Sequence, residues 1–295
     1  MARLAYLGTP DMAVPPLQAL VSAGHDVVLC VTRPDRRRGR GGQTSPSAVK
    51  EAALALGVPV SHDMDEVARA GVELAVVVAY GRIIPAALLA RVPMVNLHFS
   101  LLPRWRGAAP VERAILAGDT ETGVCLMKLE EGLDTGPVYA TRSVPLDEEV
   151  TLDALRTRLV EVGCALLVET LAGGVAGLPD PEPQRGQPTV ADKITPEDLR
   201  LEWSGTARQL ARVVRLGRAW TTFRGARVRV LDAAPAPAGP DEVGRPPGTL
   251  LGTSVCTGAG LLVLRRVQPE SRSPMSADDW WRGVHAADGE RLGTD

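Results

Sequence analysis

The sequence lacks the features that mark membrane, secreted and metal-binding proteins. No stretch approaches the roughly 18 consecutive apolar residues of a membrane span, and the opening residues, MARLAYLGTPD, contain an apolar run too short for a signal peptide. The four cysteines lie far apart, without the spacing of a zinc motif or a disulfide framework, and fit a reducing cytoplasm. The four histidines are equally scattered, so we expect no metal site.

Aromatic residues and net charge are also scarce. Aromatics make up only 3% of the chain, so a core must be built from alanine, valine and leucine, which are abundant. The 33 basic and 35 acidic residues leave a net charge of −2. Bulk charge therefore gives no sign of nucleic-acid binding, and any basic surface must be local.

The 295 residues are enough for two domains, and the first half alternates short apolar strands with helical segments. The apolar run at 74–79, LAVVVA, is typical of a central parallel strand covered on both faces. This alternation predicts an α/β domain with a doubly wound parallel sheet. Two strand-like segments, 123–129 and 138–146, predict a hairpin at the edge of that sheet, and a long helix is expected over 151–171.

The second half has a different composition. Residues 177–203 are rich in proline, glycine and charge, which predicts a linker with little packing. A helix over 205–216 and four or five short strands then predict a small β-barrel, of the oligonucleotide-binding (OB-like) type. We therefore expect a catalytic domain at 1–190, a linker at 191–203 and an OB-like domain at 204–295.

The densest chemistry lies in residues 95–110, VNLHFSLLPRWRGAAP. Asn96 and His98 end a predicted parallel strand, where ligands bind in open α/β sheets, and residues two apart point to the same face. Asp134 sits in the glycine-bounded turn GLDTG. A buried polar pair that holds a loop is one explanation. The alternative is acyl transfer, in which an amide stabilises an oxyanion while imidazole and carboxylate handle protons.

Several common catalytic motifs are missing. There is no GxSxG nucleophile motif, and Cys125 lies inside a predicted strand without a nearby base. The first strand ends in GTPD instead of GxGxxG, and no P-loop is present. Direct attack by a substrate amine is therefore favoured over a covalent intermediate, and NAD and ATP are not expected as cofactors.

Two segments concentrate arginine. The first, RPDRRRGRGGQ, contains Arg36, Arg37, Arg38 and Arg40; it is either a solvated charge run or a loop that meets a polyanion. The second lies at 200–229, where Arg208, Arg212 and Arg215 share one face of the predicted helix. Helix-face arginines also serve solubility, so this second segment is either a solvated helix face or part of an RNA-binding surface.

Together these segments resemble the methionyl-tRNA formyltransferase family. NLHFSLLPRWRGAAP followed by GLDTGPV carries the resemblance, and GTPDMAVPPL, PDRRRGRG, VVVAYGRIIP and QPESRSPMSADDW agree in order over nearly the whole chain. The resemblance implies a Rossmann-like folate-binding domain, an OB-like domain that helps hold tRNA, and 10-formyltetrahydrofolate as formyl donor. It also implies initiator methionyl-tRNA as acceptor, without a metal; we expect a monomer.

The resemblance assigns roles to individual residues. Asn96, His98 and Asp134 match the family's catalytic residues. The folate-contacting positions are matched by Ser100, Leu101, Leu102, Pro103, Tyr80, Gly81, Ile83 and Ile84. Arg40 matches a residue linked to the tRNA acceptor end, within the proposed tRNA-binding set Arg36, Arg37, Arg38, Arg40, Arg208, Arg212 and Arg215.

Four positions depart from the family pattern. Phe99 replaces a usually small residue and could narrow the cleft, Gly42 and Gln43 stand where lysines are frequent, and Ser271 stands where glycine is usual. The same chemistry on another amine, as in an amino-sugar N-formyltransferase, or a 10-formyltetrahydrofolate hydrolase is the nearest alternative. A non-catalytic RNA- or folate-binding protein and a dehydrogenase are more distant ones.

Overall fold

The computed structural model describes residues 1–37, 44–287 and 289–294. The chain divides into two compact units. Unit 1 comprises Met1–Val111, Glu121–Pro145 and Leu155–Asp192. Unit 2 comprises Glu112–Thr120, Leu146–Ala154 and Lys193–Asp295. Among the described residues, no helix combines the length and the apolar character needed to cross a bilayer.

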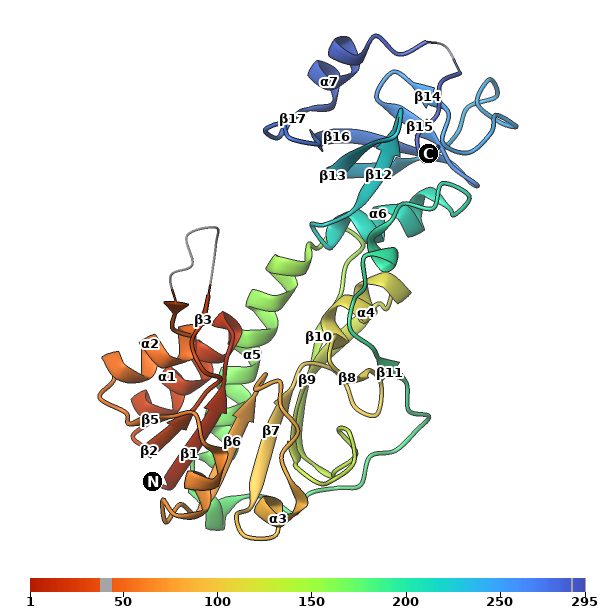
Figure 1. Ribbon diagram of the computed structural model, residues 1–295. Coiled ribbons are helices and arrows are strands. Elements are labelled where there is room, and N and C mark those ends of the chain that lie inside the picture. The colour runs from red at the N-terminus through yellow and green to blue at the C-terminus, as the bar shows by residue number, and fades with distance from the viewer. Residues whose placement is uncertain (38–43, 288, 295) are drawn as a thin grey trace. The chain divides into compact units, whose positions relative to one another are not determined.

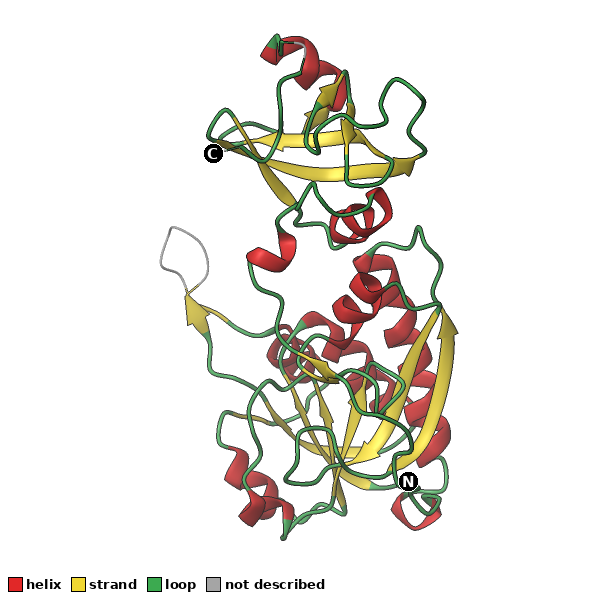
Figure 2. Ribbon diagram, turned by 90° about the vertical axis from the view of Figure 1, so that its right-hand side faces the viewer, coloured by secondary structure: helices red, strands yellow, loops and turns green. Residues whose placement is uncertain are grey.

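Unit 1 is built on a seven-stranded sheet with the order β10-β9-β7-β6-β1-β2-β5 (Figures 1 and 2). The parallel strands are β1 (Arg3–Gly8), β2 (Asp26–Val31), β5 (Val60–Ser61), β6 (Leu74–Val78) and β7 (Met94–His98). The antiparallel pair β9 (Glu121–Lys128) and β10 (Val138–Pro145) extends one edge beside β7. The predicted parallel sheet and edge hairpin are thus confirmed.

Helical segments cover both faces of this sheet, which explains why the strands are apolar on both sides. One face packs against η2 (Met64–Ala68) and α3 (Ala86–Leu89) in a core that includes Leu7, Val77 and Met94. The opposite face receives α5 (Leu152–Leu171), where Gly163 approaches Leu97. The helices α1 (Val14–Ser22) and α2 (Ala48–Ala55) pack on each other and along β2 and β5.

The strand order reverses between β1 and β6. From β1 the chain moves outward to β2 and β5, then returns to β6 on the other side of β1. Such a reversal opens a crevice at the carboxyl ends of the two strands, where ligands of doubly wound sheets bind. Here Thr9, directly after β1, donates from Oγ1 to the carbonyl oxygen of Tyr80 after β6, at 3.1 Å.

The segment predicted to be a linker with little packing is in fact well packed in its second part. Val190–Ala191 forms β11, which pairs in parallel with β8 (Arg106–Gly107). Ala191, Leu201 and Trp203 are buried. The proline- and glycine-rich composition indicated irregular backbone correctly, but irregular backbone can still be bonded to neighbouring segments.

Unit 2 contains an antiparallel sheet with the order β12-β13-β16-β15-β14, and β17 pairs with β16. These strands are β12 (Trp220–Phe223), β13 (Ala226–Ala236), β14 (Leu250–Leu251), β15 (Ser254–Cys256), β16 (Leu261–Pro269) and β17 (Met275–Ser276). The expected small β domain is confirmed. Its core includes Trp203, Phe223 and Trp280, the last from α7 (Ala277–Val284), a helix that the sequence analysis missed.

The helix α6 (Ala207–Arg215) and most of α4 (Pro110–Ala117) also belong to unit 2. The predicted helix over 205–216 is α6, which begins with a capping box between Thr206 and Gln209. Arg113 of α4 makes a two-pronged ion pair with Asp198, with N–O distances of 2.8 and 3.1 Å. Burial by itself raises the pKa of Asp198, but hydrogen bonds from Arg113 and Thr195 outweigh it and leave that pKa lowered.

Candidate active site

Asn96 and His98 lie on the same face of β7, as the two-residue period of a strand requires. This is the face on which Met94 packs toward η2 and α3, whereas Leu97 between them points toward α5. The His98 side chain is only 6% exposed. The strand therefore presents an amide and an imidazole side by side near its carboxyl end.

Asp134 comes from the loop between β9 and β10. Its Oδ1 lies 3.4 Å from Asn96 Nδ2, and its Oδ2 lies 3.6 Å from His98 Nδ1. The backbone N–H of Gly107 donates to the same Oδ2 at 2.8 Å. Asp134 has a φ of 50°, a left-handed conformation that aspartate tolerates better than most residues. The three side chains singled out in the sequence thus meet around one point.

A backbone carbonyl fixes the orientation of the His98 ring. Nε2 lies 2.9 Å from the carbonyl oxygen of Trp105, which can only accept, so Nε2 carries a hydrogen. The ring therefore turns Nδ1 toward Asp134. Neutral His98 offers a lone pair at Nδ1, whereas protonated His98 offers an N–H donor there.

The segment Ser100–Pro103 forms a tight turn directly after β7. Ser100 is buried and donates from Oγ to the carbonyl oxygen of Arg104 at 2.6 Å. The backbone N–H of Arg104 donates to the Leu101 carbonyl at 3.0 Å, and the Leu102–Pro103 peptide is cis. Phe99, the departure from the family pattern, is buried next to this turn.

The segment Tyr80–Ile84 follows β6, the neighbour of β7. Tyr80 and Ile84 are buried in the core on the site's face of the sheet. Ile83 is 91% exposed, so an apolar side chain stands free at this position. Gly81 has a φ of 71°, and its carbonyl accepts a hydrogen bond from the guanidinium of Arg33. The two predicted folate-contacting segments therefore follow adjacent parallel strands.

A covalent cysteine mechanism has no support in this site. Cys125 lies buried in β9, where burial raises the pKa of its thiol. A thiol in such surroundings stays protonated and unreactive. Within the described residues, no cluster of three or more potential histidine, cysteine, aspartate or glutamate ligands is found.

Comparison with known proteins places the chain in a family. Residues 2–171 match the formyl transferase family model, and residues 193–285 match its C-terminal domain. The methionyl-tRNA formyltransferase of Heliobacterium modesticaldum is 41% identical over 99% of this chain and 100% of its own. The methionyl-tRNA formyltransferase of Paenarthrobacter aurescens is 44% identical over 96% of this chain and 97% of its own. This chain belongs to the methionyl-tRNA formyltransferase family.

Solved structures agree in fold. A methionyl-tRNA formyltransferase from Clostridium thermocellum superposes with a TM-score of 0.59 at 16% identity, covering 79% of this chain and 93% of that one. An N-formyltransferase from Helicobacter canadensis was solved with folinic acid and dTDP-3-aminofucose. It superposes with a TM-score of 0.69 at 15% identity, covering 90% of this chain and 99% of that one. At these identities the likeness concerns the fold alone.

The arginine-rich loop of this formyltransferase is described only at its base. Arg36 and Arg37 form β3, which pairs with β4 (Thr44–Ser45). The other predicted tRNA contacts, Arg38 and Arg40, lie outside the described residues, as do Gly42 and Gln43. Beside this ladder, Lys50 of α2 bonds Asp35 at 2.7 Å, which ties the base of the loop to the domain.

The three arginines predicted on α6 do share the helix, but they have partners within unit 2. Arg212 donates to the Ala117 carbonyl at 3.3 Å, and Arg215 donates to the Asp147 carbonyl at 3.2 Å. Arg208 lies 3.8 Å from Glu148 and is largely exposed. Of the three, Arg208 is the one whose charge faces solvent most openly.

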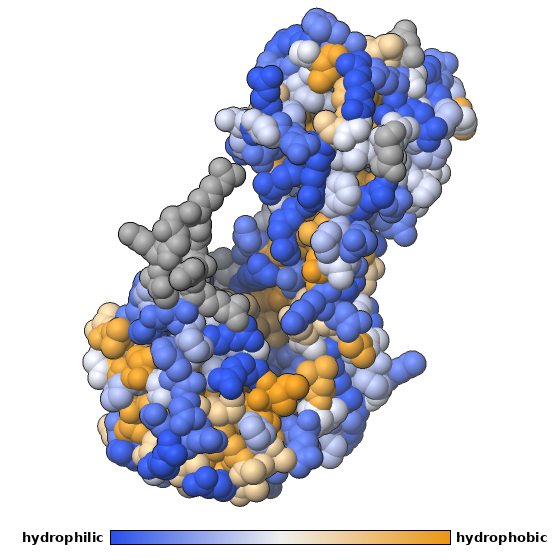
Figure 3. All heavy atoms as spheres, viewed as in Figure 1, coloured by the Kyte–Doolittle hydropathy of each residue, from blue (hydrophilic) through white to orange (hydrophobic). Residues whose placement is uncertain are grey.

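Three other arginines of the basic segment 200–229 come together in unit 2, although nothing in the sequence indicated that they share a cavity. A cavity of about 540 Å³ is lined by Arg218, Arg227 and Arg229 together with Gln268 and neighbouring residues. The Arg227 guanidinium stacks over the Trp220 ring, 4.4 Å from its centroid. Hydrophilic residues dominate the surface over β12–β17 seen in Figure 3. Arginines that share a cavity provide the local positive charge that bulk composition hides.

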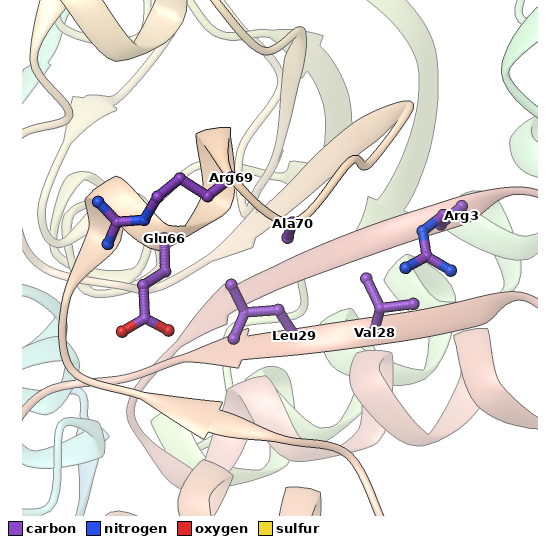
Figure 4. A pocket seen from close by; sticks show the side chains of 6 residues that line it. All are labelled: Arg3, Val28, Leu29, Glu66, Arg69 and Ala70. Carbon is purple, nitrogen blue, oxygen red and sulfur yellow. The ribbon is translucent and has the colours of Figure 1, made fainter.

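Another hollow, on unit 1, lies away from Asn96, His98 and Asp134. It is lined by Arg3, Val28, Leu29, Glu66, Arg69 and Ala70 (Figure 4). Arg3 begins β1 and pairs with Asp26 at the start of β2, so the hollow reaches the amino ends of the strands. Doubly wound sheets bind their ligands at the opposite, carboxyl ends.

The structure adds one residue to the site that the sequence analysis did not name. Gln184 lies in the segment predicted to be a linker, yet its side chain bonds the loop that carries Asp134. A single glutamine in a proline-rich segment gives no local signal of such a contact.

Proposed function

We propose that this formyltransferase moves the formyl group of 10-formyltetrahydrofolate to the free amine of methionyl-initiator tRNA. The observation that carries the proposal is the meeting of Asn96, His98 and Asp134 in a chain that aligns end to end with methionyl-tRNA formyltransferases. The relatives that align over the full length are named methionyl-tRNA formyltransferases, which supports methionyl-tRNA as the acceptor. The three side chains supply groups suited to acyl transfer.

The formyl donor fits the carboxyl ends of β6 and β7. We assign its recognition to Ser100–Pro103 and to Tyr80, Gly81, Ile83 and Ile84. The exposed side chain of Ile83 offers apolar surface to a flat heterocycle, and the backbone of the tight turn after His98 offers polar groups beside it. A structural neighbour, HypX from Aquifex aeolicus, was solved with tetrahydrofolic acid, which supports a folate at this fold.

In the reaction, the deprotonated methionyl amine attacks the formyl carbon, and a C–N bond forms while the carbonyl electron pair moves to oxygen. The Asn96 amide and the His98 imidazole are assigned to stabilise the resulting oxyanion. Asp134 accepts the proton that the new ammonium group loses. The oxyanion then re-forms the carbonyl as the bond to N10 breaks, N10 takes up the proton that Asp134 accepted, directly or through water, and tetrahydrofolate leaves.

The geometry of His98 fits this scheme because Nε2 is held by the Trp105 carbonyl. Any proton that the ring gains must go to Nδ1, the nitrogen beside Asp134. The ring nitrogen that can gain a proton therefore already faces the Asp134 carboxylate, 3.6 Å away, without rotation of the ring. Most of the remaining acceleration comes from holding two bound substrates in a reactive orientation.

We assign tRNA contacts to the arginine-rich loop, Arg36 to Arg38 and Arg40, and to the basic side chains of unit 2. Specific recognition of RNA usually targets unpaired segments and ends, and the loop's arginines suit an acceptor end. We further propose that the enzyme acts as a monomer in the cytoplasm. The four cysteines are all unpaired, which fits a reducing compartment.

The test is a direct assay. The protein is incubated with 10-formyltetrahydrofolate and with methionine charged on initiator or elongator tRNA, and formyl-methionine is measured after hydrolysis of the ester. We expect product with the initiator and much less with the elongator. Release of formate without acceptor would instead indicate a hydrolase, and transfer only to a nucleotide-linked amino sugar would indicate the sugar-modifying alternative.

A further inference from the structure

The carboxamide of Gln184 connects the two loops that form the active site. Nε2 donates to the carbonyl oxygens of Asp134 and Gly136, both at 2.8 Å. Oε1 accepts from Nε and Nη2 of Arg106, at 3.0 and 2.7 Å. Gln184 therefore bonds the Asp134 loop on one side and the loop after β7 on the other.

These four bonds use the full capacity of the side chain. A primary amide has two N–H donors and one oxygen with two lone pairs, and each is occupied. Glutamate has the same length but lacks both donors, and it would turn a negative oxygen toward two carbonyl groups. Asparagine is one methylene too short to reach both loops. The position therefore suits glutamine specifically.

The backbone around Gln184 forms a strap, residues 182–191, that runs across both loops. Glu182 exchanges two backbone hydrogen bonds with Val138, just after the Asp134 loop. Thr189 accepts at Oγ1 from the backbone N–H of Trp105 at 2.8 Å. Ala191 pairs with Gly107 through the β8–β11 ladder. The strap thus contacts the residues that orient the His98 ring and the Asp134 carboxylate.

We propose that Gln184 is a positioning residue for formyl transfer, which holds the backbone of Asp134 so that its carboxylate faces Asn96 and His98. This inference rests on the proposed function. Asp134 has a left-handed φ and lies in a loop bounded by glycines, so its own backbone preference does not fix it there. Gln184 supplies the missing restraint, since it bonds the carbonyls on either side of Thr135.

The test compares Gln184→Glu and Gln184→Met with matched changes at Gln187, an exposed glutamine three residues further along the strap. A displacement of about 1 Å at a catalytic group costs on the order of 10²-fold in rate. We expect kcat to fall by about that factor in both Gln184 variants. The KM values for folate and tRNA should change by less than about threefold, because neither substrate touches Gln184 in this scheme.

A crystal structure of each variant provides a readout independent of turnover. In the wild type, Asp134 Oδ2 lies 3.6 Å from His98 Nδ1 and 2.8 Å from Gly107 N. We expect at least the first distance to lengthen in Gln184→Glu and to stay unchanged in Gln187→Glu. Thermal melting establishes the folded fraction, by which every rate is divided.

The outcomes separate the two proposals. The positioning role is overturned if Gln184→Glu keeps the wild-type kcat. It is also overturned if the loss of kcat disappears after correction for the folded fraction and the Asp134–His98 distance is unchanged. If the wild type itself forms no formyl-methionine, the proposed function fails. The distance comparison then still decides whether Gln184 holds Asp134.

Discussion

Replacing Asp134 tests the chemistry and the architecture of the site separately. The carboxylate accepts the Gly107 N–H at 2.8 Å in surroundings that leave the side chain 13% exposed. In Asp134→Ala this donor is orphaned, which costs about 1–3 kcal/mol of stability. In Asp134→Asn the amide oxygen can still accept from Gly107, so the loss of stability should be clearly smaller.

The two variants should differ in stability but lose rate to a similar extent. Both substitutions remove the proposed proton acceptor, and positioned acid–base groups contribute about 10²–10⁴-fold. That range corresponds to about 2.7–5.4 kcal/mol of barrier at about 1.36 kcal/mol per tenfold. We therefore expect Asp134→Asn to lose this much in kcat while unfolding at nearly the wild-type denaturant concentration.

The assay is single-turnover formylation with both substrates saturating, combined with urea unfolding of the same preparations. Glu131→Gln is the matched control, because Glu131 is exposed in the same loop and the change removes one negative charge as well. If Asp134→Asn kept more than about a tenth of the wild-type rate, Asp134 would not be the proton acceptor, and the role assigned here would be wrong.

Three further outcomes follow from the geometry of unit 2. Arg218→Ala with Arg227→Ala should raise the tRNA KM, leave kcat unchanged and flatten the salt dependence of tRNA binding by about one unit of log–log slope per lost phosphate contact; an unchanged slope in filter-binding assays would exclude this cavity from the tRNA surface. Asp198→Asn should cost about 1.5–3 kcal/mol at pH 7, as hydrogen bonds to charged groups do. The pKa of Asp198 is lowered in the folded protein, so its contribution to the free energy of unfolding is fully present above the ordinary aspartate pKa of about 3.9. That contribution is lost as pH falls through the folded pKa. The free energies of unfolding of wild type and variant should therefore become equal in acid and stay different above about pH 5. Ser271 has a φ of 58°, a conformation that costs an L-residue about 1–2 kcal/mol. Glycine removes this strain but adds entropy to the unfolded chain, so Ser271→Gly should stabilise the protein by a net of about 0.5–1 kcal/mol. The control Ser273→Gly should not raise the melting temperature.

The sequence was informative wherever a local pattern determines the structure. An unbroken apolar run such as 74–79 has to be covered on both sides, and that requirement leads to a parallel sheet between helices. The two-residue period of a strand places Asn96 and His98 on one face whatever the rest of the chain does. Glycines bounding a turn likewise indicate backbone freedom, which the left-handed Asp134 uses.

Long-range contacts left no comparable trace. Gln184 meets Asp134 across 50 positions of sequence, and nothing in PDPEPQRGQP distinguishes a strap from a solvated linker. On α6 the helical period was predicted, but the period cannot tell whether an arginine faces solvent or a backbone carbonyl. Arg212 and Arg215 bond backbone carbonyls, so the helical period alone does not assign them to a tRNA surface.

The distribution of unusual backbone conformations adds a physical argument for where function lies. Among the described residues, six non-glycine residues have positive φ, and three belong to unit 1: Ala79, Trp105 and Asp134. Ala79 precedes the Tyr80–Ile84 segment, Trp105 orients the His98 ring, and Asp134 supplies the carboxylate. Such conformations persist only where surrounding contacts over-determine them. In unit 1 the strap and the loop after β7 hold two of these positions, Trp105 and Asp134, through hydrogen bonds. The same bonds that stabilise the strained backbone therefore also set the spacing of the proposed reactive groups.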